Sequence, residues 1–196
     1  MHLQSKIILA SQSGARKEIL SNLGILNPEV SKHEVEESKF DFNFSVSRSI
    51  IKLAYLKAES VKKKKSSKKH KSIIIAADTV IYRAKKIFYK PKSQDEVRSH
   101  LKNLSSRKHI VFGGICVISP KGKVYKKLVK TEVYFHKIVD SELTQEILDD
   151  GIGKAGGYAI QNLGIRFVKK IRGCYTNIVG ISIPELYKIL KSPEFI

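Results

Sequence analysis

The segment that most constrains the fold is residues 73–81, an apolar run rich in β-branched side chains that contains one acid, Asp78. A run this short and this apolar predicts a strand that is buried on both faces of a sheet. Burying an ionised carboxylate without compensation is costly, so Asp78 needs a cation, a metal, or a place where the strand enters a pocket. The alternative is that Asp78 caps a turn at the end of the strand.

Strand and helix patterns alternate along the rest of the 196 residues. Period-2 or continuous apolar runs predict strands, and 3.6-residue periodicity predicts helices. This order predicts a single α/β domain over residues 1–196 with a mixed sheet flanked by helices. The predicted strands are 6–10, 29–35, 73–81, 87–89, 109–118, 124–138, 158–161 and 165–171. One predicted helix follows the loop 11–16 and ends before Gly24, a second runs from 45 to about 63, a third begins at a capping box of Ser93 and Glu96, a fourth runs from 142 to 149, and the last begins at 182.

The net charge of +19 is the unusual feature of the composition. It indicates either an anionic partner or a lysine-rich, solvated surface. The lysine run at 62–71 lacks aromatic side chains that could stack bases, so we interpret it as a solvated loop and expect no nucleic-acid partner. The apolar run 7–10 is too short for a signal peptide or a membrane span, and Cys116 and Cys174 form no metal-type cluster. We therefore expect a cytoplasmic protein with two free thiols and no membrane contact.

Several charged side chains lie at positions where a bound anion or metal ion would compensate their charge. The loop 11–16 joins a strand to a helix, and such a helix N-terminus favours phosphate. Arg16 opposes the helix dipole there unless an anion is bound, although it could also be an exposed surface arginine. Lys57 falls within the apolar stripe of its helix, where it either extends to solvent or meets negative charge. Glu36 and Glu37 either balance lysines or bind Mg²⁺.

Residues 151–164 are rich in glycine, which predicts close approach of the backbone to another group. The pattern Gly151-x-Gly153-x-x-Gly156 matches the dinucleotide fingerprint only formally, because it follows a predicted helix rather than a strand. We therefore reject a dinucleotide site. Lys154 lies inside this loop.

Six motifs, in order along nearly the whole chain, together resemble the Maf family of nucleoside triphosphate pyrophosphatases. No single motif is specific for this family, but the six motifs together are. They are Leu9-Ala10-Ser11-x-Ser13-x-x-Arg16, Leu53-Ala54-x-x-Lys57-Ala58, Ala77-Asp78-Thr79, Lys90-Pro91, Lys154-Ala155-Gly156-Gly157-Tyr158-x-Ile160-Gln161 and Tyr175-x-Asn177-x-Val179-Gly180.

The resemblance implies a mixed, elongated α/β fold with an active-site cleft, and a homodimer. It also implies hydrolysis of a nucleoside triphosphate to the monophosphate and diphosphate (pyrophosphate) with a divalent cation, Mg²⁺ or Mn²⁺. By position, Asp78 matches the general base and a metal ligand, and Glu36 or Glu37 matches the acidic metal-side position. The phosphate-side positions are Ser11, Ser13, Arg16, Lys57, Lys90 and Lys154.

Substrate choice is where the chain departs from the family pattern. Thr79 and Gln161 match the branch that acts on dTTP and UTP, whereas the 7-methyl-GTP branch carries Gln and Glu there. Ala15, however, replaces the arginine usual in the pyrimidine branch, and Gly113 and Asn162 replace a threonine and a glycine. The alternatives are a pyrophosphatase for 7-methyl-GTP or modified purines and, in another class, a basic nucleic-acid-binding protein.

Overall fold

A computed structural model describes residues 5–37, 40, 42, 45–65 and 72–195. Within these ranges the chain forms a seven-stranded sheet in the order β2-β1-β3-β5-β6-β7, with β4 paired to β3. β1 pairs parallel with β2 and β3, whereas β4 and β7 pair antiparallel with their neighbours, so the sheet is mixed as predicted. The strands are β1 (Ile7–Leu9), β2 (Glu29–Val30), β3 (Ile73–Arg83), β4 (Lys86–Phe88), β5 (Lys108–Ile118), β6 (Val124–Phe135) and β7 (Val168–Arg172).

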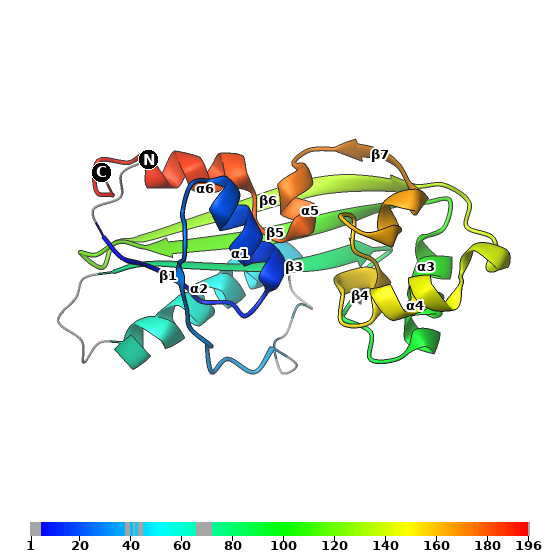
Figure 1. Cartoon of the computed structure of the whole chain (residues 1–196), viewed down its shortest axis with the longest axis horizontal. Helices are drawn as coiled ribbons and strands as arrows, with labels where there is room; N and C mark the ends of the chain where they lie inside the picture. The colour runs from blue at the N-terminus through cyan, green and yellow to red at the C-terminus, as the bar shows by residue number, and fades with distance from the viewer. Residues whose placement is uncertain (1–4, 38–39, 41, 43–44, 66–71, 196) are drawn as a thin grey trace. The chain divides into compact units, whose positions relative to one another are not determined.

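Figure 1 shows the helices of the described ranges together with these strands. None of these helices is long and apolar enough to cross a membrane. The α-helices are α1 (Gly14–Asn22), α2 (Val46–Lys65), α3 (Gln94–Leu104), α4 (Gln145–Gly151), α5 (Tyr175–Val179) and α6 (Ile183–Leu190), and the 3-10 helices are η2 (Asp140–Glu142), η3 (Ala155–Gly157) and η4 (Leu163–Phe167).

The chain divides into two compact units. Unit 1 comprises Met1–Asp78, Gly113–Val129 and Gly180–Ile196, and unit 2 comprises Thr79–Phe112 and Lys130–Val179. The long strands β3, β5 and β6 contribute residues to both.

In unit 1, α2 packs on one face of the sheet. The core cluster there joins even-numbered strand residues to the apolar stripe of α2, and its members are Ile8, Ala10, Ile74, Ala76, Cys116, Ile118, Ala54, Ala58 and Val61. Gly114 has the same parity, and a Cβ added to it would collide with the carbonyl oxygen of Ile50. Glycine at this position therefore allows α2 to approach β5 closely.

In unit 2, α3 and α4 pack with β4, β5 and β6 around a core that includes Val97, Leu101, Phe135, Leu148 and Phe167. Ser93 begins α3 as predicted, since its hydroxyl accepts the N–H of Glu96 at 3.3 Å. The reciprocal bond of a capping box is shifted by one residue, because the Glu96 carboxylate accepts the N–H of Lys92 instead.

Several predicted elements were wrong in extent or type. β2 ends at Val30, and although the N–H of Ser31 still donates to Leu9 O of β1 at 3.0 Å, residues 31–35 are not a strand. Residues 158–161 form turns between η3 and η4 rather than a strand, and β7 begins at Val168 rather than at residue 165. The lysine run was expected to be a loop, but its first residues, 62–65, continue α2, and residues 66–71 lie outside the described part of the chain.

Candidate active site

Asp78 lies in the middle of β3 with 5% of its surface exposed. Side chains alternate across a strand, so Asp78 points to the same face as Ile74 and Ala76, which is the face that α2 covers. The carboxylate therefore has to be compensated by a group from α2 or from a neighbouring loop. It is not the cap of a turn at the strand end, because β3 continues to Arg83.

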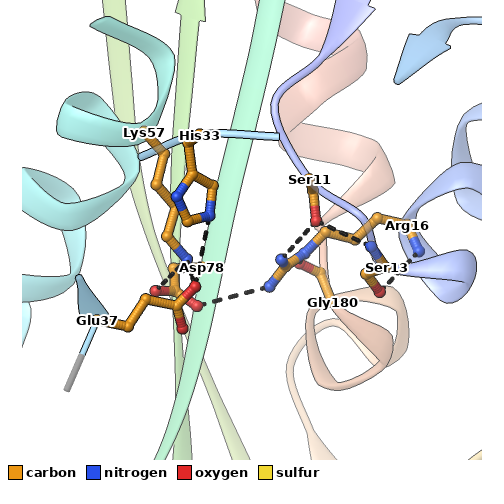
Figure 2. A network of polar contacts seen from close by, with 8 residues as sticks. All are labelled: Ser11, Ser13, Arg16, His33, Glu37, Lys57, Asp78 and Gly180. Carbon is orange, nitrogen blue, oxygen red and sulfur yellow. Dashed lines mark hydrogen bonds and ion pairs between the residues drawn. The ribbon is translucent and has the colours of Figure 1, made fainter. Parts of the chain in front are cut away.

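Lys57 of α2 supplies the first compensating charge. It lies within the buried stripe of the helix, 2% exposed, and its ammonium group donates to Asp78 Oδ2 at 2.8 Å. The same Nζ donates to Glu37 Oε1 at 2.7 Å, so one cation bridges two carboxylates (Figure 2). The structure thus places Lys57 against negative charge rather than along a path to solvent.

Arg16 of α1 supplies the second compensating charge. Its Nη2 lies 3.7 Å from Asp78 Oδ1, Nη1 donates to Ser11 Oγ at 3.1 Å, and Nε donates to the carbonyl of Gly180 at 3.0 Å. Gly180 has a positive φ of +149°, which residues with a side chain rarely adopt, and a Cβ there would crowd the stem of Arg16. Arg16 is therefore fixed between β3 and the chain segment that precedes α6.

The two serines of the loop before α1 organise the helix N-terminus. Ser13 is the N-cap of α1, and its hydroxyl accepts the N–H of Arg16 at 3.4 Å. Ser11, 5% exposed, accepts the N–H of Ser13 at 3.2 Å. The first turn of α1 contains no acidic residue and does contain Arg16. The helix dipole at this end and the positive charge of Arg16 both favour a bound anion.

The carboxylates near Lys57 bear on metal binding. Among the described residues there is no group of three or more His, Cys, Asp or Glu side chains that could hold a metal ion. Asp78 and Glu37 nevertheless converge on one cation, the Lys57 ammonium, and carboxylate oxygens are the ligands that Mg²⁺ and Mn²⁺ prefer, usually together with water and substrate phosphates. These two residues fit a divalent ion whose other ligands come from a substrate. Glu36 is exposed on the same segment.

The sequence reasoning missed His33, whose Nε2 lies 3.5 Å from Glu37 Oε1. The spacing of four residues was visible in the sequence, but outside a helix that spacing has no fixed geometry. The motif that ends at Gly180 gave this glycine no role, whereas its carbonyl contacts Arg16 across 164 positions of the chain. No local pattern marks such a contact.

The remaining predicted site residues belong to unit 2. Thr79 is half-buried in β3, whereas Lys90, Lys154 and Gln161 are exposed. The backbone joins the segments of the two lysines, since the N–H of Gly153 donates to Pro91 O at 2.9 Å and the N–H of Gly156 donates to Tyr89 O at 3.2 Å. Within this unit Lys90 and Lys154 are therefore carried by hydrogen-bonded neighbouring loops.

A buried polar pair supports the glycine-rich loop in unit 2. His109 Nε2 lies 2.8 Å from the hydroxyl of Tyr158, and both rings pack on Phe135. Burial, with a smaller contribution from Arg83, lowers the pKa of His109 to about 3, and burial raises the pKa of Tyr158. Both side chains are therefore neutral at neutral pH and act as part of the core.

The three residues that depart from the motif pattern lie in a helix, a strand and a turn. Ala15 is half-buried in the first turn of α1, and Gly113 is buried in β5. Asn162 donates from Nδ2 to Asp150 Oδ1 at 2.8 Å, which ties the turn after Gln161 to α4.

Comparison with known proteins gives consistent matches. A family model described as "Maf-like protein" matches residues 6–193. The dTTP/UTP pyrophosphatase of Thermoanaerobacter sp. (strain X514) is 43% identical over 188 residues, 95% of each chain. The protein of the same name from Chelativorans sp. (strain BNC1) is 38% identical over 100% of this chain and 94% of its own. That from Clostridium beijerinckii is also 38% identical, over 95% of this chain and 98% of its own.

One solved structure gives a more distant likeness. It is the nucleoside-triphosphatase / dITP/XTP pyrophosphatase of Mycobacterium abscessus ATCC 19977 / DSM 44196, which is 13% identical and matches 68% of this chain and 74% of its own, with a TM-score of 0.38.

Proposed function

Because the chain belongs to the Maf family, as its motifs suggested, we propose that it hydrolyses nucleoside triphosphates to the monophosphate and pyrophosphate. The substrates that the names of its relatives support are dTTP and UTP. The observation that carries the proposal is the arrangement of Lys57 and Arg16 around Asp78, next to the N-terminus of α1. A site for triphosphate hydrolysis needs this combination of a carboxylate, fixed cations and an anion-binding helix end.

In the proposed mechanism, Arg16, Lys57 and the N–H groups at the start of α1 bind phosphate oxygens and offset charge that develops during attack on the α-phosphorus. Asp78 orients the attacking water and accepts its proton, while the bond from the α-phosphorus to the bridging oxygen breaks and pyrophosphate leaves. Arg16 and Lys57 fix the carboxylate of Asp78 in a single orientation, which such a base requires.

Asp78 and Glu37, with Glu36 as a further candidate, are the residues that would hold Mg²⁺ or Mn²⁺. Such an ion, when bound, supplies additional neutralisation of the phosphate charge. Lys90 and Lys154 are proposed as further phosphate ligands on the basis of the motif match. Thr79 and Gln161 are proposed to read the base, since the amide of Gln161 offers both a donor and an acceptor to uracil or thymine. A homodimer is also proposed, and sedimentation equilibrium tests it.

A nucleotide panel with Mg²⁺ or Mn²⁺, assayed separately for pyrophosphate and phosphate, tests the reaction class. We expect pyrophosphate from dTTP and UTP at rates above those for CTP, GTP, ITP, XTP and 7-methyl-GTP. Release of phosphate alone would overturn the proposal, and a preference for ITP, XTP or 7-methyl-GTP would replace the substrate. Tight, steeply salt-dependent binding of DNA or RNA without hydrolysis would instead support the nucleic-acid-binding alternative.

The variant Asp78→Asn tests the base. The change is nearly isosteric, so we expect a folded protein that has lost at least about 10²-fold in kcat, the lower range for general base catalysis. Asp95→Asn, an exposed acid in the first turn of α3, is the matched control and should retain activity. If Asp78→Asn keeps most of its kcat, Asp78 is structural.

A further inference from the structure

The segment 29–37, which we call the acidic segment, runs along α2 in the opposite direction to the helix. Three contacts join them in reverse order: Glu29 pairs with Lys65, Glu34 bonds to Ser60, and Glu37 bonds to Lys57. Lys57 and Ser60 are three residues apart on α2, so they lie on neighbouring positions of one helix face. The path of the acidic segment along that face therefore brings Glu37 to Lys57.

Ser60 bonds to the backbone of this segment between the sheet and Glu37. Pairing with β1 reaches Ser31, whose N–H donates to Leu9 O at 3.0 Å. Three residues later, the N–H of Glu34 donates to Ser60 Oγ at 2.9 Å. Glu37 follows three residues after Glu34, and its carboxylate accepts a hydrogen bond from the Lys57 ammonium at 2.7 Å.

The ion pair between Lys64 and Glu34 holds the backbone of the acidic segment less well than the Ser60 hydroxyl does. Lys64 lies 3.8 Å from Glu34, but the two side chains are 50% and 76% exposed. Exposed pairs of long side chains contribute little, because solvent screens them and both side chains lose conformational freedom. The Ser60 hydroxyl is short and bonds directly to a backbone N–H, so it restricts the position of the segment itself.

We propose that Ser60 is a positioning residue for nucleotide hydrolysis, acting through the acidic segment to hold the Glu37 carboxylate beside Lys57 and Asp78. The inference rests on the proposed function, because Glu37 is a candidate ligand of the divalent cation there. Loss of the Ser60 hydroxyl frees the Glu34 N–H and lets Glu37 leave this position. The cation then binds more weakly, while Lys57 and Arg16 keep their contacts with Asp78.

The test compares Ser60→Ala with Ser60→Thr, which keeps a hydroxyl, and with Ser49→Ala, a serine on the same face of α2 about three turns earlier. The Mg²⁺ concentration for half-maximal activity should rise about three- to tenfold in Ser60→Ala, the factor expected for one neutral hydrogen bond. The kcat at saturating Mg²⁺ should stay within about twofold. Ser60→Thr and Ser49→Ala should behave like the wild type.

Two further measurements separate positioning from a general loss of stability. Amide hydrogen exchange of the nucleotide-free and metal-free protein should speed up in peptides covering residues 31–37, with α2 unchanged. In a Glu37→Gln background, Ser60→Ala should have no further effect on the Mg²⁺ requirement, because its only proposed route is through Glu37.

An unchanged Mg²⁺ requirement in Ser60→Ala, or an equal effect with and without Glu37→Gln, would overturn the inference. Unchanged hydrogen exchange in the acidic segment would do the same. If the wild type releases no pyrophosphate from any nucleotide, the proposed function fails, and the catalytic role of Ser60 fails with it. Normal wild-type turnover with an insensitive Ser60→Ala removes only this inference.

Discussion

Replacing Lys57 with methionine removes the ammonium that bridges Asp78 and Glu37 while keeping most of the apolar stem that packs in α2. Removing one partner of a buried ion pair typically costs about 3–5 kcal/mol, because the other charge stays buried without compensation. The Asp78 side chain is only 7% exposed, but Arg16 remains 3.7 Å away, and Glu37 is 38% exposed and can turn to water. We therefore expect the lower end of this range, about 3 kcal/mol of unfolding free energy.

Urea unfolding at neutral pH of the wild type, Lys57→Met, Asp78→Asn and the double variant measures this cost. The double variant should lose less than the sum of the single losses, by about 1–3 kcal/mol, because a neutral amide beside methionine needs no cation. A loss below about 0.5 kcal/mol for Lys57→Met, with additive single effects, would refute the reasoning, since it would mean that the carboxylates are compensated without Lys57.

Three further predictions concern packing, pH and substrate choice. Gly114→Ala forces a Cβ against the Ile50 carbonyl, so it should cost about 1–3 kcal/mol in urea unfolding and reduce turnover. Gly14→Ala, which has open space, should keep wild-type stability, and equal stability of both variants would contradict the close packing of α2. Burial lowers the pKa of His109 to about 3, so its side chain stays neutral in the folded state, whereas in the unfolded state it takes up a proton below about pH 6.5. The free energy of unfolding is therefore highest above that pH and falls by about 1.4 kcal/mol per pH unit towards pH 3. His109→Phe should be less stable at pH 7 but lose less between pH 7 and pH 5, and an equal loss in both proteins would show that His109 does not cause the acid sensitivity. Gln161→Glu should lower kcat/KM for dTTP and UTP relative to GTP and 7-methyl-GTP by about 1–3 kcal/mol of discrimination, and an unchanged order and ratio would show that Gln161 does not read the base.

The sequence determined the two elements that carry the centre of the site. The apolar run of β3 identified a buried strand with Asp78 inside it, and the helical period of α2 placed Lys57 in the buried stripe. Both patterns are local, because the alternation of a strand and the turn of a helix are set by backbone geometry within a few residues. The six motifs also identified the family, since their order and spacing carry information that no single motif has.

Sequence patterns predicted the wrong secondary structure where a segment has the composition of a strand but does not form one. Residues 158–161 have the composition of a strand, but Gly156 and Gly157 directly before them have φ of +72° and +78°, and the chain turns. The residues after Ser31 likewise leave the sheet, and the N–H of Glu34 bonds to Ser60 on α2 rather than to a strand. Intrinsic strand preference is weak, and tertiary contacts override it at such places.

Only the tertiary structure decided which charges meet. Lys57 could have reached solvent, and Arg16 could have been a surface residue, until the packing of α2 at Gly114 and the bond from Arg16 to Gly180 fixed their directions. The pairing of Asp78 with Lys57 and Arg16 joins three segments that are far apart in the sequence. A side chain finds such partners through the register of strands and the approach of helices, which depend on the packing of the whole unit rather than on neighbouring residues.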